Sequence, residues 1–331
     1  MKILIIRFSH LGDIVLTQPI VQRLHEVFPD AELYYLTKEQ YKDIPALFGI
    51  PLTVLSSSKL LSSFSQLRSK QFDLIFDLQN KLNSFLIKYF CLRARTFTYD
   101  KKRSLRQAIV KHKTDRGIDS TLDLYQSALL KAAKELKLPE LAEGLNNPQL
   151  ILNPDVLEKI QSRLHKPDGN KSIALFPGAT HKTKIYPAEN LIRFIQQTGK
   201  DYHYWLLGSK EESGLTYRIH FETADRSTDL AGKFSLAELI YVIAMADAVI
   251  TNDSGPMHLA AALGKPQIAI FGSTHPRLGF RPLNDKAVIL CKDKSCQPCS
   301  LHGLEACPRK HFACMLSLHP EELVSALKSL L

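Results

Sequence analysis

The chain has 331 residues, 45% of them hydrophobic and 23% charged, which is ordinary for a globular protein and enough for two domains. Its formal net charge of +10 favours anionic partners such as nucleic acid, an acidic membrane surface or a phosphorylated substrate. The apolar run before Arg7 is too short for a secretory leader, and no stretch approaches the ~18 apolar residues of a membrane span, so we expect a cytoplasmic protein.

The first half alternates strand-like and helix-like segments. Strands are expected at 2–7, 32–37, 51–55 and 72–78, and helices at 13–28, 58–70 and 119–137. This βαβ alternation predicts a parallel sheet with helices on both faces. Between the last two of these segments, residues 101–116 are rich in Lys and Arg. They form either a solvated surface or a cradle for an anionic substrate.

The second half repeats the pattern after a stretch rich in Pro, Asn and Gly that carries a short helix at 155–164. Strands are expected at 172–179, 202–209, 247–252 and 266–272, and helices at 188–199, 235–246 and 256–264. We therefore predict an α/β protein with two Rossmann-like domains facing across a cleft, at 1–150 and 171–331, joined by a linker at 151–170. The last helix is a candidate to pack back on the N-terminal domain.

Polar residues follow the ends of four expected strands, where ligands bind in open parallel sheets. In "SHLGDIVL" (9–16), Gly12 permits a tight turn and Asp13 falls near a helix start, where free N–H groups stabilise a carboxylate. Asp13 is either a plain helix cap or a carboxylate held ionised to act as a base.

Three further strand ends lie in the second half. "FPGATHKTKIYP" (176–187) places Thr180 and Lys184 on a loop that can hold phosphate oxygens. "GSKEES" (208–213) offers acidic residues to ribose hydroxyls or to solvent. "TNDSGPMH" (251–258) combines Asp253, the free N–H groups of Ser254 and Gly255 at a helix start, and His258. A capped and packed helix explains Asp253, Gly255 and Pro256 but not the histidine.

Several enzyme classes are disfavoured by missing motifs. No G-x-G-x-x-G follows a strand, and no Walker loop, G-x-S-x-G or H-E-x-x-H is present. Nucleic acid is disfavoured as a partner because no nucleic-acid-binding motif and no aromatic–basic repeat is visible.

Four segments in order then resemble one family. They are "RFSHLGDIVLTQPIVQRLHEVFPDAEL", "FPGATHKTKIYP", "LAGKFSLAELIYVIAMADAVITNDSGPMHLAAALGKPQIAIFGSTHP" and "CQPCSLHGLEACPRKHFACM". The series is similar to the ADP-heptose:lipopolysaccharide heptosyltransferases, inverting glycosyltransferases of the GT-B type. The resemblance implies an N-terminal domain that binds the anionic inner core of lipopolysaccharide and a C-terminal domain that binds the nucleotide sugar.

The resemblance also implies roles for single residues. The family's general base falls on Asp13 and its phosphate-binding lysine on Lys184, although Tyr186 stands where the family usually has tryptophan. The nucleotide-contacting acid falls on Glu211 or Glu212, of which we favour Glu212. The remaining donor-binding positions are Thr180, Asp253, Ser254, Gly255 and His258. Weaker acceptor-binding candidates are Lys101, Lys102, Arg103 and Arg106.

The chemistry so implied requires no metal, although Mg²⁺ could assist the leaving diphosphate. Cys296, Cys299, Cys307 and Cys314 have spacing that could hold structural zinc; reduced buried thiols are the reading we favour. Transient contact with the inner membrane suits a lipid-anchored acceptor.

Three alternatives stay open: a nucleotide-sugar epimerase of the same fold, a glycosyltransferase that uses a different donor sugar, and a binding protein without turnover. The joint presence of Asp13, Lys184 and Asp253 argues against the last.

Overall fold

The structure is a computed structural model that describes residues 1–57, 64–114, 116–164 and 169–331. The chain divides into two compact units. The first comprises Met1–Lys102 with Ser120–Ile151, and the second comprises Arg103–Asp119 with Leu152–Leu331. The first domain expected from the sequence is therefore corrected in one respect, because residues 103–119 belong to the second unit.

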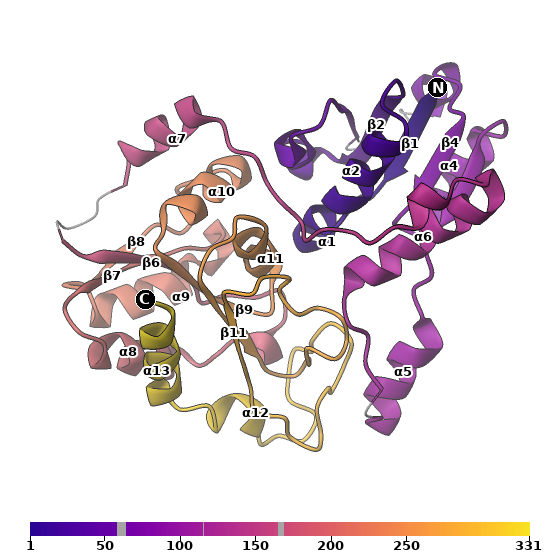
Figure 1. Cartoon of the computed structure of the whole chain (residues 1–331). Coiled ribbons are helices and arrows are strands. Elements are labelled where there is room, and N and C mark those ends of the chain that lie inside the picture. The colour runs from indigo at the N-terminus through magenta and orange to yellow at the C-terminus, as the bar shows by residue number, and fades with distance from the viewer. Residues whose placement is uncertain (58–63, 115, 165–168) are drawn as a thin grey trace. The chain divides into compact units, whose positions relative to one another are not determined.

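The first unit is built on a five-stranded parallel sheet in the order β3-β2-β1-β4-β5. Its strands are β1 (Lys2–Ile6), β2 (Glu32–Lys38), β3 (Thr53–Ser57), β4 (Leu74–Asp77) and β5 (Arg95–Thr98). Its helices are α1 (Leu11–Val15), α2 (Gln18–Val27), α3 (Phe64–Ser69), α4 (Leu82–Phe90) and α6 (Thr121–Leu136), with 3-10 helices η1 (Glu39–Tyr41), η2 (Pro45–Phe48) and η4 (Pro139–Ala142). Strands β2, β1 and β4 of this sheet are labelled in Figure 1.

The second unit holds a six-stranded parallel sheet in the order β11-β10-β9-β6-β7-β8. Its strands are β6 (Lys171–Phe176), β7 (Tyr202–Leu206), β8 (Ser227–Asp229), β9 (Ala248–Asn252), β10 (Gln267–Phe271) and β11 (Ala287–Cys291). Its helices are α5 (Arg103–His112), α7 (Pro154–Gln161), α8 (Ala188–Gln197), α9 (Ser213–Glu222), α10 (Leu236–Met245), α11 (Gly255–Ala262), α12 (Ala313–Leu316) and α13 (Pro320–Leu330), with 3-10 helices η5 (Lys182–Lys184) and η6 (Lys210–Glu212).

Both sheets have the strands expected of a parallel sheet buried on its two faces. All five residues of β9 and of β10 are buried, and so are four of the five in β1. Such continuous apolar runs form because helices cover each side and leave no polar face. The two Rossmann-like α/β units predicted from the sequence are therefore confirmed.

The expected helix at 13–28 is two helices, α1 and α2. Pro19 lies in the first turn of α2, where it lacks the N–H that a continuous helix would use to reach the Val15 carbonyl. The Thr17 hydroxyl donates to the Ile14 carbonyl (2.6 Å) at the junction. The turn holding Asp13 is thus a separate short helix directly after β1. The expected helix at 58–70 begins outside the described residues and continues as α3.

The last helix, α13, packs against α8 and β10 in the second unit. Its buried residues Leu323, Ala326 and Leu327 share a core with Leu191 and Ile270. These contacts answer the question that the sequence left open, because the apolar face of this helix is buried in the C-terminal unit.

Candidate active site

Strand order places the candidate residues at the two points where a ligand is expected. Chain connections run in opposite directions from the neighbouring pair β1 and β4, and again from the pair β6 and β9. At such a switch point the loops after the two strands separate and leave room beyond their carboxyl ends. Asp13 follows β1, whereas Lys184 and Asp253 follow β6 and β9.

In the first unit, Asp13 is held from three directions. The Arg7 guanidinium lies 2.5 Å from Asp13 Oδ2, the Tyr125 hydroxyl donates to Oδ1 (2.8 Å), and the His10 backbone N–H donates to Oδ2 (3.2 Å). The Arg7 side chain also donates to the Leu78 carbonyl (2.6 Å) and lies 5.3 Å from the centre of the Tyr125 ring. The carboxylate therefore caps the start of α1 through the His10 N–H, and Arg7 and Tyr125 fix its orientation.

Burial acts to raise the pKa of the Asp13 carboxyl, but the Arg7 guanidinium and the hydrogen bonds from His10 and Tyr125 outweigh it and lower the pKa well below its usual range. The pKa of Arg7 is raised in turn, because Asp13 outweighs the effect of burial. Asp13 is consequently ionised at neutral pH. The side chain retains 20% exposure, so a substrate hydroxyl can reach it.

The lowered pKa predicts how Asp13 contributes to stability. In the unfolded chain an aspartate titrates near ~3.9, above its value in the folded protein. The stabilisation is therefore fully present above that pH and is lost as the pH falls below it. We expect the difference in thermal unfolding midpoint between wild type and Asp13→Asn to be constant from about pH 5 to 8 and to shrink below about pH 4. A difference that already declined near pH 6 would contradict the lowered pKa.

The four basic acceptor candidates are not one cluster. Lys101, in the first unit, donates to the Asn80 carbonyl (2.8 Å), and Lys102 is exposed beside it in the chain. Arg103 begins α5 and belongs to the second unit. Arg106 is buried, with its guanidinium 5.1 Å from the centre of the Phe280 ring. Arg106 therefore packs within the second unit, and its role in acceptor binding stays a prediction.

In the second unit, Lys184 and Asp253 form an ion pair. Lys184 Nζ lies 3.0 Å from Asp253 Oδ2, and the two side chains are only 13% and 6% exposed. The Thr274 hydroxyl donates to the same carboxylate oxygen (2.7 Å). Asp253 therefore positions Lys184 as well as occupying the loop after β9.

Asn252 ties the loops after β6 and β9 together. Its side-chain amide donates to the carbonyls of Pro177 (2.8 Å) and Gly178 (3.2 Å), and its oxygen accepts from the Tyr186 N–H (3.1 Å). The Tyr186 side chain is fully buried and donates to the Leu318 carbonyl (2.7 Å). Tyr186 is therefore an anchor of the loop that carries Lys184.

The Glu212 carboxylate accepts from the Ser209 N–H (2.8 Å). It also lies against Gly178 and Gly208, because a Cβ at either glycine would come within 3.0 Å of its oxygens. Gly232 is hydrogen-bonded to the Gly208 carbonyl (3.0 Å), so the loop at 231–236 lies beside Glu212. The structure thus places Glu212 between the loop after β6 and the loop at 231–236.

The other donor candidates follow strands β6 and β9. Ser254 is the N-cap of α11, and its hydroxyl donates to the Asn252 carbonyl (3.2 Å). Gly255 begins the helix, and His258 is buried in it. Thr180 is exposed on the loop after β6.

The C-terminal cysteines are free thiols. Cys296 Sγ lies 4.0 Å from His311 Nε2, and the Cys299 thiol donates to the Cys296 carbonyl (3.4 Å). Burial raises the pKa of the Cys314 thiol to about 12. Within the described part of the chain, no three His, Cys, Asp or Glu side chains are arranged to hold a metal ion.

Sequence reasoning missed Arg7, Tyr125, Asn252 and Thr274. Arg7 and Asn252 carried a signal, since each is a polar residue at the end of a buried strand. Tyr125 carried none, because it lies 112 positions from Asp13 in the sequence.

Solved heptosyltransferases share this fold. The structure of E. coli ADP-heptose lps heptosyltransferase II matches with a TM-score of 0.78 at 21% identity, over 100% of this chain and 98% of that one. E. coli heptosyltransferase WaaC with ADP matches with a TM-score of 0.66 at 18% identity, over the whole of both chains.

Sequence comparison gives the family. The model of glycosyltransferase family 9 (heptosyltransferase) matches residues 60–305, and the chain belongs to this family. The lipooligosaccharide heptosyltransferase 2 of Campylobacter jejuni is 29% identical over 100% of this chain and 98% of its own length. The lipopolysaccharide heptosyltransferase 2 of Escherichia coli K12 is 26% identical over 88% of each chain. The family membership decides against the epimerase and against a binding protein without turnover.

The helices of the described residues include none that is both long and apolar enough to cross a membrane.

Proposed function

We propose that the enzyme transfers a heptose from ADP-heptose to the inner core of lipopolysaccharide with inversion at the anomeric carbon. The observation that carries this proposal is the ionised Asp13 carboxylate fixed by Arg7 and Tyr125 after β1. The family match and the names of the relatives supply the sugar and the acceptor class.

In this mechanism an acceptor hydroxyl attacks the anomeric carbon of the donor while Asp13 accepts its proton. The bond from that carbon to the diphosphate oxygen breaks, and ADP leaves with the bonding electrons. The Lys184 ammonium and the free N–H groups at the start of α11 stabilise the negative charge that develops on the diphosphate. Thr180 supplies a further donor to the phosphates, and Glu212 accepts from the nucleoside.

A low pKa makes Asp13 a weak base but keeps all of it in the reactive form at neutral pH. Proton transfer is therefore expected to accompany bond cleavage rather than precede it. Arg7 stays charged throughout and holds the carboxylate in one orientation. Tyr125 fixes Oδ1, which leaves the exposed part of the group for the substrate.

Transfer tests the proposal directly. Purified enzyme is incubated with ADP-heptose and a panel of defined truncated lipopolysaccharide cores, with and without EDTA. We expect one core to gain a heptose, EDTA to leave the rate unchanged because Lys184 supplies the charge, and nuclear magnetic resonance to show inverted anomeric configuration. Use of another nucleotide sugar in preference to ADP-heptose would favour the different-donor alternative.

The acceptor is anchored in a lipid layer, so we also propose that the enzyme works in the cytoplasm with transient contact to the surface of the inner membrane. The net charge of +10 supports this location, because the membrane and the acceptor both carry negative charge.

A further inference from the structure

Helix α4 of the first unit presents an apolar face to solvent. Leu82, Phe85 and Tyr89 are 72%, 59% and 64% exposed, and their spacing places them on one side of the helix. The opposite side is the one that packs inward, through Ser84 and Ile87. Helices of globular proteins normally bury their apolar face and expose a polar one, and α4 has apolar residues on both sides.

The exposed face continues into the residues that follow the helix. Phe90 is 38% exposed, with its ring centroid 5.8 Å from that of Tyr89, and Leu92 is 79% exposed. Leu82, Phe85, Tyr89, Phe90 and Leu92 are called the α4 apolar surface below. Five large apolar side chains gathered within eleven positions are far more than scattered exposed residues, which need no explanation.

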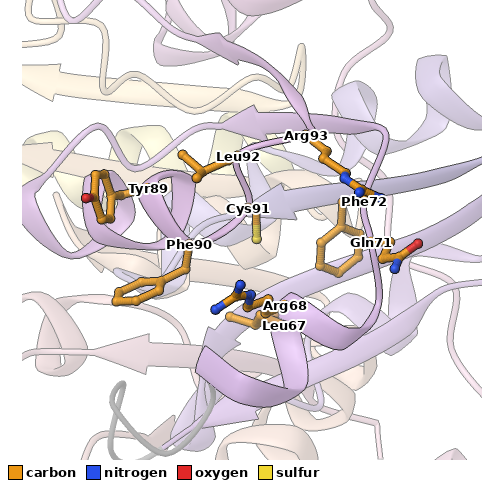
Figure 2. Close-up of a pocket in the computed structure, with 9 residues that line it drawn as sticks. All are labelled: Leu67, Arg68, Gln71, Phe72, Tyr89, Phe90, Cys91, Leu92 and Arg93. Atoms are coloured by element: carbon orange, nitrogen blue, oxygen red, sulfur yellow. The ribbon is translucent and has the colours of Figure 1, made fainter.

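A cavity of about 450 Å³ adjoins this surface (Figure 2), and it contains both apolar and basic side chains. Leu67 and Phe72 line it from one side, and Phe90 and Leu92 from the other. The guanidinium groups of Arg68 and Arg93 lie at the same cavity. A cavity with this lining suits an amphipathic molecule that has an apolar chain and an anionic group.

The helix and the residues that follow it carry only positive charges of their own, of which Arg95 is paired with Glu135 (3.6 Å). The sequence contains no Asp or Glu from residue 78 to residue 99, whereas Lys81, Arg93 and Arg95 in this stretch are exposed. Arg68 is also exposed. Aromatic and aliphatic side chains on a helix flanked by cations are the combination that lies in the headgroup region of an anionic bilayer.

We propose that the α4 apolar surface docks the enzyme on an anionic phospholipid bilayer. Phe85 and Tyr89 enter the headgroup region, and Lys81, Arg68 and Arg93 contact lipid phosphates. The inference deepens the membrane location advanced with the proposed function, because it names the surface that makes the contact. A bilayer is favoured over a second copy of the chain, since two copies joined by this face would bring like charges together.

The test measures co-sedimentation of the full chain with lipid vesicles, without donor or acceptor. Wild type is expected to bind vesicles of phosphatidylcholine mixed with phosphatidylglycerol and to bind pure phosphatidylcholine weakly. Phe85→Ser combined with Tyr89→Ser is expected to lower the partition coefficient roughly tenfold or more, since the two aromatic side chains that enter the headgroup region are lost. The thermal midpoint should stay unchanged because both side chains are exposed.

The matched control is Tyr217→Ser combined with Phe221→Ser on α9, where the two rings are also exposed, at 61% and 70%. This control should bind vesicles as wild type does. Should the α4 double variant fail to fold, Lys81→Gln with Arg93→Gln replaces it and is expected to lose binding to the anionic vesicles.

Three results would overturn the proposal: wild type that ignores anionic vesicles, an α4 or charge variant that binds them as wild type does, or a wild-type dimer in sedimentation velocity that the α4 variant dissociates. The outcome is separable from that of the proposed function. Transfer to a water-soluble truncated core needs no bilayer, so the α4 variant should keep that activity even when it no longer binds vesicles.

Discussion

Asp13→Asn is expected to lower kcat for heptose transfer by roughly 10²–10⁴-fold, the usual contribution of a general base. Asn has nearly the same shape and keeps one oxygen, which can accept from Tyr125 or from the His10 N–H but not from both, because these two donors bind different oxygens of Asp13. It cannot accept a proton from the acceptor hydroxyl. The affinity for ADP, measured by calorimetry, should be nearly unchanged, because the proposed diphosphate contacts lie in the other unit.

The main risk in this variant is stability. Removing one partner of a buried ion pair leaves Arg7 uncompensated, which typically costs about 3–5 kcal/mol. Thermal unfolding with and without ADP shows whether the variant is folded at the assay temperature. Asp30→Asn, at an exposed position after α2, is the matched control and should keep wild-type turnover. If folded Asp13→Asn turned over ADP-heptose at the normal rate, Asp13 would not be the base.

The second large effect is expected for Lys184→Ala. Loss of a charged hydrogen bond to the diphosphate, worth about 1.5–3 kcal/mol, should weaken ADP binding roughly 10- to 150-fold in calorimetry. The ion pair adds to this effect, because Asp253 would then face the phosphates without its cation. Lys184→Ala combined with Asp253→Ala should therefore bind ADP more tightly than Lys184→Ala alone.

Lys182→Ala is the matched control for this experiment. Lys182 lies on the same 3-10 helix, two residues away, but its side chain is 77% exposed. Its loss should change ADP affinity by no more than about twofold, as expected for an exposed charge. Equal ADP affinity in wild type and Lys184→Ala would remove Lys184 from the phosphate site.

The fold could be predicted from the sequence to a large extent because parallel strands buried on both faces need continuous apolar runs. Such runs at 2–7, 172–179 and 266–272 became β1, β6 and β10. β5 went unpredicted because its sequence, RTFT, contains one fully apolar side chain and forms the edge of the sheet. Helix α4 was missed for a different reason, since apolar residues on both sides gave it no periodicity.

The sequence by itself determined that Asp13, Lys184 and Asp253 lie beyond the ends of buried strands, because the apolar run of each strand is evident from its own residues. Tertiary structure decided what these groups contact. The pairing of Asp13 with Arg7 and Tyr125, and of Lys184 with Asp253, depends on which strands are neighbours and which helix returns to their ends. The pKa of Asp13 is set by those contacts, which join residues up to 112 positions apart, and so no local pattern could report it.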